Sequence, residues 1–290
     1  MSKEKFEFFL FRFFSFLIKL LGLNFSRRLG KAIGTFAFYF IPIRKAVVIQ
    51  NLATAFPDKT LSEIKKIAKK NFQNIFITFF EFMYVPFSTK EEIKKIGVIE
   101  NPESLKKIID AKKGVVLFTA HFGSWEIGAF LISTLLEIKL YELAKRQSNN
   151  LINDWLTKAR EVHGNKMIWV GPSVRHLIEV LKKGEVVGLL ADQRGPIDSP
   201  RIKFFGKPTA FPIGSATIAA RTNSNVVFIV AIRQKDFNYK IVYEILDNST
   251  LPIDNELRAI EINQRYANFL EKIISQHPEQ YFWMHKLWKY

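Results

Sequence analysis

Short runs of apolar and β-branched residues, alternating with stretches of helical periodicity, occupy most of the chain after Gly114. The runs expected to form strands span residues 115–120, 138–144, 166–170, 186–191, 226–232 and 239–246. Helical patterns lie between most of them, at 124–137, 150–163, 173–183 and 214–223, and a last one follows at 256–275. Strands that are apolar on both faces and alternate with helices are typical of a parallel sheet covered on both sides. We therefore predict an α/β fold, a mostly parallel central sheet flanked by helices.

The N-terminal stretch 6–23 has a different texture, with seven Phe residues at positions 6–16. Arg12 and Lys19 interrupt it and no small-residue cleavage site follows, so it resembles neither an ordinary secretory leader nor the roughly 20 consecutive apolar residues of a transmembrane helix. Lys5, Arg12 and Lys19 are seven residues apart, which places them on one narrow stripe of an otherwise apolar helix. Such a helix can lie in a membrane interface, with its basic side chains extended to the headgroups.

The charge balance also favours a membrane surface. Residues 1–45, which include a second apolar run at 32–43, hold nine Lys or Arg against two Glu. The whole chain has 43 Lys and Arg against 27 Asp and Glu, a net charge of +16, and 28 Phe. Nucleic acid and anionic membranes are the common partners of such a basic chain, and Phe-dense helices favour the membrane. We expect membrane-associated helices at 1–45 and the α/β domain at 46–290. Packing of both runs into a soluble core, and a single tilted span at 8–23, stay open as alternatives.

Between these regions the sequence predicts a long helix that has Ser62 as its N-cap and ends near Tyr84. Its apolar positions follow helical spacing, and its lysines lie on the other side as a solvated face. The stretch 88–113 is charged and is expected to be helical or irregular. The sequence has no internal repeat, no low-complexity segment and no obvious interdomain linker.

Several common chemistries have no support in the sequence. It contains no Cys, and therefore no disulfide, no thiol nucleophile and no Cys-ligated metal site. Its five His residues show no paired ligand spacing. The Gly-rich nucleotide loops, the H-E-x-x-H zinc motif and the G-x-S-x-G elbow of serine hydrolases are absent. We therefore expect neither a metal ion nor a cofactor.

The segment that most suggests catalysis is GVVLFTAHFGSWEIGAF, which begins at Gly114. Its apolar strand ends at Ala120, so His121 lies at the carboxyl end of a strand, where open α/β sheets place their ligands. The following turn leads to a helix that Ser124 is expected to cap, with Glu126 in its first turn. We expect the Glu126 carboxylate to bond one ring nitrogen of His121. The other nitrogen would then be a general base that deprotonates an alcohol as it attacks a thioester.

These residues resemble the H-x4-D/E box of glycerolipid and lipid A acyltransferases, and the rest of the sequence narrows the resemblance. It is similar to the lipid A biosynthesis acyltransferase family, the lauroyl and myristoyl transferase group, over essentially the whole chain. The similar segments are RK at Arg44, NLATAFP at Asn51, KRQSNN at Lys145 with Arg160 and Gly164, ADQ at Ala191, GP at Gly195, FFG at Phe204, and HPEQYFWMHK at His277. The sequence departs from the family's pattern at Arg194, Phe211 and Leu287, and these departures bear on the acyl acceptor more than on the reaction.

The resemblance implies an O-acyltransferase that moves a fatty acyl chain from acyl carrier protein to a hydroxyl of a phosphorylated glycolipid, the lipid A precursor. It implies His121 as general base and Glu126 as the residue that orients it. It also implies the cytoplasmic face of the bacterial inner membrane as the location. An acidic carrier protein, a phosphorylated acceptor and an anionic leaflet would each attract a chain of charge +16.

Four further residues are candidates for substrate binding. Arg146 and Arg160 are candidates for phosphate or oxyanion contacts, because a guanidinium pairs bidentately with phosphate. Asp192, which follows the carboxyl end of a strand, is a candidate for binding the acceptor or supporting the site, with helix capping as the alternative. Asn149 is a candidate with turn formation as its alternative. The closing segment 277–285 is expected to be a packed structural clasp.

Two other functions compete with this interpretation. A glycerophosphate-type acyltransferase shares the histidine box, although the other similar segments are not typical of it. A basic nucleic-acid-binding protein would explain the net charge of +16, but it would not explain the N-terminal Phe cluster, and no recognition motif is present. We therefore expect no nucleic acid partner.

Overall fold

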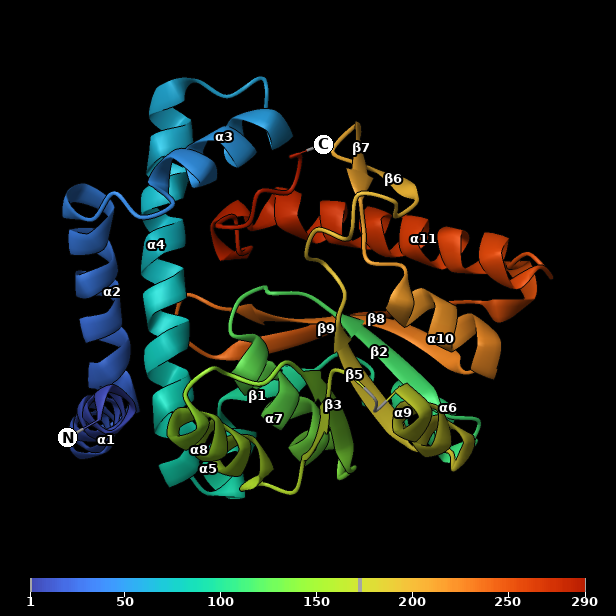
Figure 1. Ribbon diagram of the computed structural model, residues 1–290, viewed down its shortest axis with the longest axis horizontal. Helices are drawn as coiled ribbons and strands as arrows, with labels where there is room; N and C mark the ends of the chain where they lie inside the picture. Colours follow the sequence, from blue (N-terminus) through green and yellow to red (C-terminus); the bar gives the residue numbers. More distant parts are fainter. Residues whose placement is uncertain (1, 172–173, 290) are drawn as a thin grey trace.

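A parallel sheet lies at the centre of the structure, a computed structural model that describes residues 2–171 and 174–289. Within this part of the chain the sheet has seven strands in the order β1-β9-β8-β2-β5-β3-β4, with helices on both faces (Figure 1). The strands are Gly97–Ile99 (β1), Val115–Thr119 (β2), Leu140–Ala144 (β3), Lys166–Trp169 (β4), Val186–Leu190 (β5), Asn225–Arg233 (β8) and Tyr239–Ile245 (β9). Neighbouring strands pair in parallel except β8 with β9, so the predicted sheet is confirmed.

All the strands expected from the sequence form, within one or two residues of their expected bounds. The sequence missed β1, a three-residue edge strand that pairs with β9. It also missed β6 (Arg201–Phe204) and β7 (Lys207–Ala210), an antiparallel pair outside the main sheet. Strand β1 is only three residues long, β6 alternates charged and buried residues, and β7 contains a proline, so none of them has the continuous apolar run that marks the central strands.

The central strand β2 is apolar on both sides because helices cover both faces of the sheet. Val115 and Leu117 belong to one core cluster, and Val116 and Phe118 belong to another. The first cluster lies under α5 (Lys90–Lys95), α6 (Pro102–Asp110) and α7 (Trp125–Leu136). The second lies under α9 (Val174–Lys182), α10 (Gly214–Thr222) and α11 (Asn255–Gln276). This double burial accounts for the unbroken apolar run.

The chain leaves β2 and β5 in opposite directions. From β2 it passes through α7 to β3, which lies beyond β5 in the sheet. From β5 it passes through β6, β7 and α10 to β8, which lies on the other side of β2. In open α/β sheets a crevice for ligands forms where neighbouring connections diverge in this way. The carboxyl ends of β2 and β5 are therefore the expected place for a site.

The N-terminal helices pack along one end of the sheet (Figure 1). They are α1 (Lys3–Leu21), α2 (Leu23–Phe40), α3 (Lys45–Ala55) and α4 (Leu61–Tyr84). Helices α2 and α4 approach so closely that a Cβ atom on Gly34 would lie 2.6 Å from the Cα of Gln73. The N-cap of α4 is Thr60, which forms a capping box with Glu63, so the prediction of Ser62 is wrong by two residues.

A buried ionic cluster joins α2 and α4 to the β8–β9 pair. The Glu81 carboxylate accepts hydrogen bonds from Arg27 Nε at 2.7 Å, from Arg233 Nη2 at 2.6 Å and from the Tyr239 hydroxyl at 2.6 Å. Burial alone would raise the pKa of Glu81, but the two guanidinium groups lower it overall. The N-terminal helices are thus tied into the body of the protein, and the division of the chain into 1–45 and 46–290 stays a prediction.

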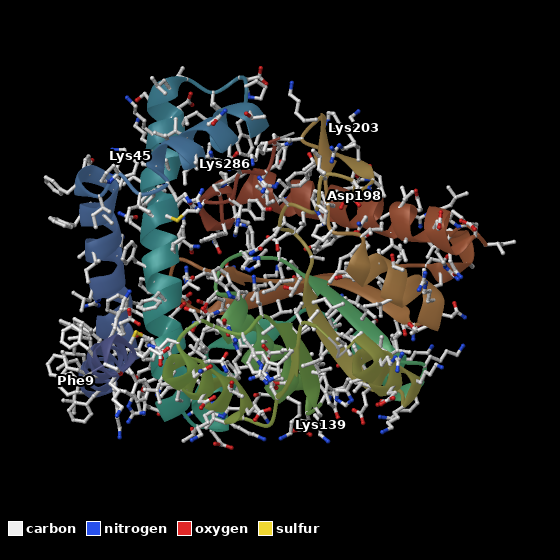
Figure 2. All side chains as sticks on the ribbon, in the orientation of Figure 1. Phe9, Lys45, Lys139, Asp198, Lys203 and Lys286 are labelled. Carbon is white, nitrogen blue, oxygen red and sulfur yellow. The ribbon has the colours of Figure 1, made fainter. Side chains whose placement is uncertain are left out.

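Large apolar side chains are exposed along the outer surface of α1 and α2. They are Phe6, Phe9, Leu10, Phe13, Phe14, Phe16, Leu20, Leu21, Phe25, Phe36, Tyr39 and Phe40, with Ile43 just beyond α2. Figure 2 shows Phe9 at the outer edge of α1, away from the rest of the chain. We refer to these residues as the N-terminal apolar surface. Most of the Phe run is therefore not packed into a soluble core.

A helix that crosses a bilayer must be long enough and apolar enough to span its hydrocarbon core. Within residues 2–171 and 174–289, no helix meets both requirements alone. Helices α2 and α3 meet them only when taken together, across a bend of 95°.

Candidate active site

His121 lies directly after β2, and its ring is bonded to Asp192, which lies directly after β5. The Nδ1 atom of His121 is 2.8 Å from Asp192 Oδ1, and the backbone N–H of His121 donates to Asp192 Oδ2 at 3.0 Å. The pairing of the two strands explains the contact, because Thr119 is in register with Leu190. Residues two positions further along each strand therefore meet. The Asp192 side chain is only 2% exposed and is fixed by the fold.

The two hydrogen bonds of the His121 ring define which nitrogen is basic. A carboxylate only accepts, so Nδ1 carries the proton and donates to Asp192. Nε2 then holds a lone pair, which accepts from the Gln193 amide nitrogen at 3.1 Å. Burial lowers the pKa of His121, but the charge and hydrogen bond of Asp192 raise it more, so the net shift is upward. This is the arrangement of a general base with a carboxylate behind it.

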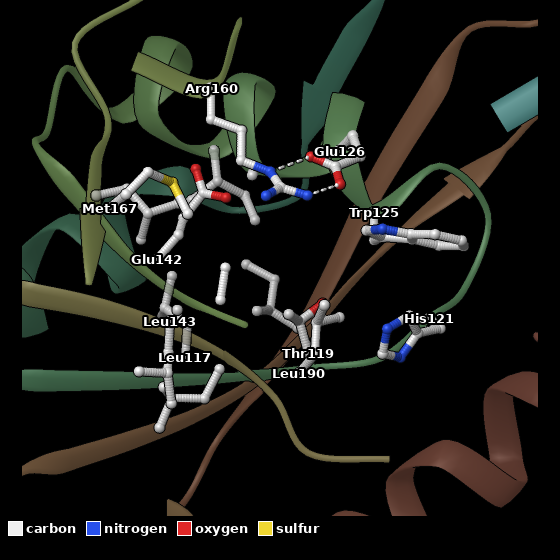
Figure 3. Close-up of a pocket in the computed structure, with 18 of the residues that line it drawn as sticks. Leu117, Thr119, His121, Trp125, Glu126, Glu142, Leu143, Arg160, Met167 and Leu190 are labelled. Carbon is white, nitrogen blue, oxygen red and sulfur yellow. Dashed lines mark hydrogen bonds and ion pairs between the residues drawn. The ribbon is translucent and has the colours of Figure 1, made fainter. Parts of the chain in front are cut away.

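The prediction that Glu126 bonds the ring of His121 is wrong. The Glu126 carboxylate accepts two hydrogen bonds from Arg160, from Nε at 3.0 Å and from Nη2 at 2.6 Å. Figure 3 shows this pair above Trp125, with His121 on the other side of the indole ring. The first turn of α7 directs Glu126 toward α8 (Asn150–Glu161), whose last turn carries Arg160. Glu126 still acts on the site at a distance, because its charge contributes to raising the pKa of His121.

The other predicted binding residues have different environments. Arg160 lines the same cavity as His121, but it is paired with Glu126, so a phosphate contact by Arg160 stays a prediction. Arg146 is exposed and lies over the ring of Trp169, 5.1 Å from its centroid. Asn149 caps α8 by accepting from two backbone N–H groups, and its amide donates to Glu4 and Glu7 of α1. Asn149 is therefore a helix cap, and a role for it in substrate binding stays a prediction.

The start of α7 beside His121 has no side-chain cap. Ser124 occupies the N-cap position as predicted, but its hydroxyl makes no capping hydrogen bond. The Ser124 Oγ is buried and has no hydrogen-bond partner. The N–H groups of a first helical turn have no acceptors within the helix and carry a partial positive charge. This end of α7 therefore presents donors next to the imidazole.

A cavity of about 420 Å³, within the size range of small-molecule sites, is lined by His121, by strands of the sheet and by α7. Its apolar wall comes from the sheet, α7 and the end of β4, and consists of Leu117, Ala129, Ile132, Leu140, Leu143, Met167, Val170, Leu189, Leu190, Ile229 and Ala231. Gly128 and Gly188 also line it. Figure 3 shows His121 on one side of the cavity and the side chains of Leu117 and Leu143 on the other. A cavity of this kind suits a hydrocarbon chain whose reactive end lies at the imidazole.

The family model for bacterial lipid A biosynthesis acyltransferases matches residues 2–290. The chain belongs to this family. It is 25% identical over 263 residues to the lipid A biosynthesis palmitoleoyltransferase of Escherichia coli (strain K12), across 90% of this chain and 84% of the relative. It is 27% identical over 266 residues to the lipid A biosynthesis lauroyltransferase of the same organism, with the same coverage. The protein is therefore an acyltransferase of the lipid A biosynthesis family, and the resemblance seen in the sequence is confirmed.

One titratable residue in the acyltransferase cavity was missed by sequence reasoning. Glu142, on β3, lines the cavity and accepts a hydrogen bond from Asn165 Nδ2 at 2.7 Å. Burial, together with the negative charge of Glu126, raises the pKa of Glu142 from 4.5 to about 7. Nothing in the local sequence marks this position, because the burial comes from helices and strands that are distant in sequence.

The closing segment of the acyltransferase forms the predicted clasp around the catalytic loop. The N–H of Phe282 donates to the carbonyl oxygen of His121 at 2.9 Å, and the N–H of Gly123 donates to the carbonyl oxygen of Gln280 at 2.9 Å. The clasp also brings His285 to the site, with its ring centroid 6.3 Å from that of His121. The sequence had given His285 no functional role. Among the described residues, no three His, Asp or Glu side chains form a metal-binding group.

Proposed function

We propose that this acyltransferase moves a fatty acyl chain from acyl carrier protein to a hydroxyl of a phosphorylated glycolipid, the lipid A precursor, at the cytoplasmic face of the bacterial inner membrane. The observation that carries the proposal is the basic Nε2 of His121 beside a cavity that has an apolar wall. The attacking hydroxyl needs a general base, and the acyl chain of the donor needs an apolar cavity. The relatives named for palmitoleoyl and lauroyl transfer in lipid A biosynthesis support this class of acceptor.

The reaction begins when the acceptor hydroxyl gives its proton to Nε2 of His121 as its oxygen attacks the thioester carbonyl carbon. The imidazolium that forms is stabilised by Asp192, whose carboxylate is 2.8 Å from Nδ1. The tetrahedral intermediate then collapses and its carbon–sulfur bond breaks. The imidazolium returns the proton to the departing thiolate. The products are an ester and the free thiol of the carrier, and the enzyme regains its resting protonation state.

We assign the oxyanion of the tetrahedral intermediate to the uncapped first turn of α7. This turn follows His121 by a few residues, and its side-chain cap is missing. Backbone donors fixed before the reaction stabilise the developing charge without reorganising. In this proposal Glu126 positions Arg160 at the wall of the cavity. The guanidinium then adds positive potential near the thioester. Glu126 raises the pKa of Arg160 by more than burial lowers it, so the guanidinium stays charged.

The proposed location and donor are supported by surface chemistry. The N-terminal apolar surface, which includes Phe9 and Leu20, exposes large apolar side chains of the kind that mark membrane or protein interfaces. The exposed basic residues Lys5, Arg12 and Lys19 on α1 favour attraction to an anionic leaflet. The net charge of +16 also favours an acidic carrier protein through long-range attraction.

The test is an acyl transfer assay with purified full-length protein in detergent. Acyl carrier protein loaded with lauroyl chains is mixed with the lipid A precursor or with glycerol 3-phosphate, and the products are identified by mass spectrometry. We expect transfer to the glycolipid, and we expect His121→Ala to reduce it about a thousandfold or more. His176→Ala is the matched control, because His176 is exposed and pairs with Glu179 on α9. Preferred transfer to glycerol 3-phosphate, or normal turnover by His121→Ala, would contradict the proposal.

A further inference from the structure

A second cavity, of about 410 Å³, shares Gln193 with the first cavity, and basic residues dominate its lining. Its lining residues are Arg44, Gln193, Arg194, His285, Lys286 and Lys289. Four of these six carry a positive charge, and none of the described residues that line it is acidic. They come from three parts of the chain: the start of α3, the loop after β5 and the C-terminal segment. We refer to this space as the basic cavity.

The basic cavity opens next to the catalytic base. Gln193 lines both cavities, and its side-chain nitrogen is 3.1 Å from Nε2 of His121. The imidazole of His285 has its centroid 6.3 Å from that of His121. A group held in the basic cavity is therefore within a few ångströms of the atom that removes the proton of the acceptor hydroxyl.

The fold holds these basic residues in place through the backbone around them. The Asn51 amide of α3 donates to the carbonyl oxygens of Trp283 and His285, at 2.8 and 2.5 Å. Arg194 Nη1 donates to the carbonyl oxygen of Lys286 at 3.1 Å, which joins the loop after β5 to the C-terminal segment. Arg44 begins α3 with a left-handed backbone, φ 60°. The cavity is thus formed before any ligand arrives, which reduces the entropy cost of binding.

The chemistry of the lining selects an anion rich in oxygen atoms. Arg44 and Lys286 bring a guanidinium and an ammonium group to one space, where a bound phosphate would accept charge-assisted hydrogen bonds from both. Burial lowers the pKa of His285, and the neighbouring His121, Arg44 and Arg194 lower it further. A neutral imidazole still has one N–H to donate to a phosphate oxygen.

We propose that the basic cavity holds a phosphate group of the acceptor glycolipid and thereby sets the acceptor hydroxyl against Nε2 of His121. This inference rests on the proposed function, because it assigns part of the same acceptor to a second site. It also replaces Arg146 and Arg160 as the main phosphate contacts, since one stacks on Trp169 and the other is paired with Glu126.

The position of the cavity favours the acceptor over the donor as the source of the phosphate. Arg44 follows Phe40 and Ile43, which are 70% and 68% exposed at the end of the N-terminal apolar surface. Figure 2 shows Lys286 near α3, at the same end of the molecule as Lys45 and far from Lys139. A lipid embedded beside the N-terminal apolar surface reaches this cavity with its headgroup. The donor also carries a phosphate, on the phosphopantetheine arm of its carrier, but its acyl chain belongs in the apolar cavity.

The first experiment compares Arg44→Gln/Lys286→Gln with a control, Lys139→Gln/Lys235→Gln, which removes two exposed positive charges away from the cavity. Each protein is assayed with the lipid A precursor and with its dephosphorylated form, at saturating lauroyl carrier protein. The KM for the donor is measured separately, with lauroyl carrier protein, acyl-phosphopantetheine and acyl-pantetheine. In the wild type and the control, we expect the KM for the phosphorylated acceptor to be about tenfold or more below that for the dephosphorylated one. We expect the cavity variant to lose this preference, with the KM for the donor within about twofold of wild type.

Two results of this assay would overturn the inference. The first is a preference for the phosphorylated acceptor that survives in Arg44→Gln/Lys286→Gln, or that is missing from the wild type. The second is an increase in the KM for the donor, together with lost discrimination between acyl-phosphopantetheine and acyl-pantetheine. That second result would assign the basic cavity to the phosphate of the donor.

The second experiment does not depend on acyl transfer. Inorganic phosphate and N-acetylglucosamine 1-phosphate are titrated into ¹⁵N-histidine-labelled protein, and the His285 signals, assigned with His285→Gln, are followed by NMR. We expect saturable shifts in the wild type and the control, and binding about tenfold or more weaker in Arg44→Gln/Lys286→Gln. Phosphate binding without acyl transfer would contradict the proposed function and leave the basic cavity standing. Acyl transfer without saturable phosphate binding would overturn this inference and leave the proposed function standing.

Discussion

The Nδ1 atom of His121 lies 2.8 Å from Asp192 Oδ1, although 71 positions separate the two residues in the chain. The contact follows from the parallel pairing of β2 and β5, which places each residue two positions beyond a registered pair. Because both strands are buried in the centre of the sheet, the geometry of the pair is fixed by the core of the protein. Asp192, and not Glu126, is therefore the residue that orients the imidazole.

Replacing Asp192 with Asn is expected to change both the rate and its pH dependence. Burial remains in the variant, while the charge and hydrogen bond that raise the pKa of His121 are lost. A base must be neutral to act, so the rate rises as pH increases through that pKa. In the wild type this rise lies above the ordinary value of 6.5, and we expect it at lower pH in Asp192→Asn. We also expect the plateau of kcat/KM to fall about 10²- to 10⁴-fold.

The measurement is kcat/KM from pH 5 to 9, with Asp198→Asn as the control. Asp198 is an exposed residue of the same loop. If Asp192 were only structural, the variant would lose activity or stability without moving the acidic limb of the profile. A lowered plateau with an unmoved limb would therefore contradict the assigned role.

The sequence predicted the central sheet because the signal for it is local. Each central strand is an unbroken apolar run, and the helices between them follow helical spacing. His121 was identified by its place at the end of such a run. Its partner could not be identified in the same way, because only the strand order β2-β5 brings Asp192 to it. Glu126 is close to His121 in sequence, but the direction of α7 carries it to Arg160.

The basic cavity illustrates the same limit. Arg44, Arg194 and Lys286 all lie in segments that the resemblance had singled out, but they are more than 90 residues apart in the chain. Their convergence depends on Asn51, which ties the C-terminal segment to α3. Single-sequence patterns carry no information about contacts of this kind. Glu142 escaped notice for a similar reason, since its burial comes from the elements packed around β3.

A larger side chain at Gly188 is expected to shorten the acyl chain that the enzyme transfers. Gly188 lines the apolar cavity, and a Cβ atom there would lie 3.4 Å from Leu140 Cδ1, an ordinary contact distance. A valine therefore fits the strand and fills part of the cavity. Each methylene of the acyl chain that no longer fits in the cavity loses about 0.8 kcal/mol of burial free energy, which corresponds to about a fourfold lower relative rate. We expect the preferred chain to shorten by about two or three carbons.

The measurement is competition among carrier proteins loaded with chains of different length. Gly214→Val is the control, because a Cβ atom at Gly214 meets no atom within 4 Å and Gly214 does not line the cavity. An equal fall in rate for all chain lengths in Gly188→Val would mean that the acyl chain does not occupy this cavity.

Glu142→Gln is expected to stabilise the protein above neutral pH. The pKa of Glu142 is raised from 4.5 to about 7, so between these values the native protein holds a proton that the unfolded chain releases. The free energy of unfolding therefore falls as pH rises through this window, and the loss persists above it. Gln cannot ionise and still accepts the hydrogen bond from Asn165. We expect the variant to be more stable by about 1–2 kcal/mol at pH 8 and similar to wild type at pH 4.5.

Urea denaturation at both pH values measures this difference, with Glu103→Gln, an exposed position on α6, as the control. Equal stability of Glu142→Gln and wild type at pH 8 would show that the Glu142 carboxylate is not penalised in the folded protein.

The N-terminal apolar surface is expected to bind anionic vesicles through side chains that contribute little to folding. Phe9 and Leu20 are 60% and 66% exposed, so replacing both with Ser removes apolar area from a bilayer contact and leaves the core intact. We expect Phe9→Ser/Leu20→Ser to weaken binding to phosphatidylglycerol-containing vesicles about tenfold or more, with an unchanged melting temperature. Added salt should weaken binding of the wild type, because basic residues contribute to it.

The matched control is Ile253→Ser/Leu257→Ser at the start of α11. It also removes two large apolar side chains, which are 98% and 59% exposed. Equal vesicle binding by the two variants in a co-sedimentation assay would contradict a role of the N-terminal apolar surface in membrane binding.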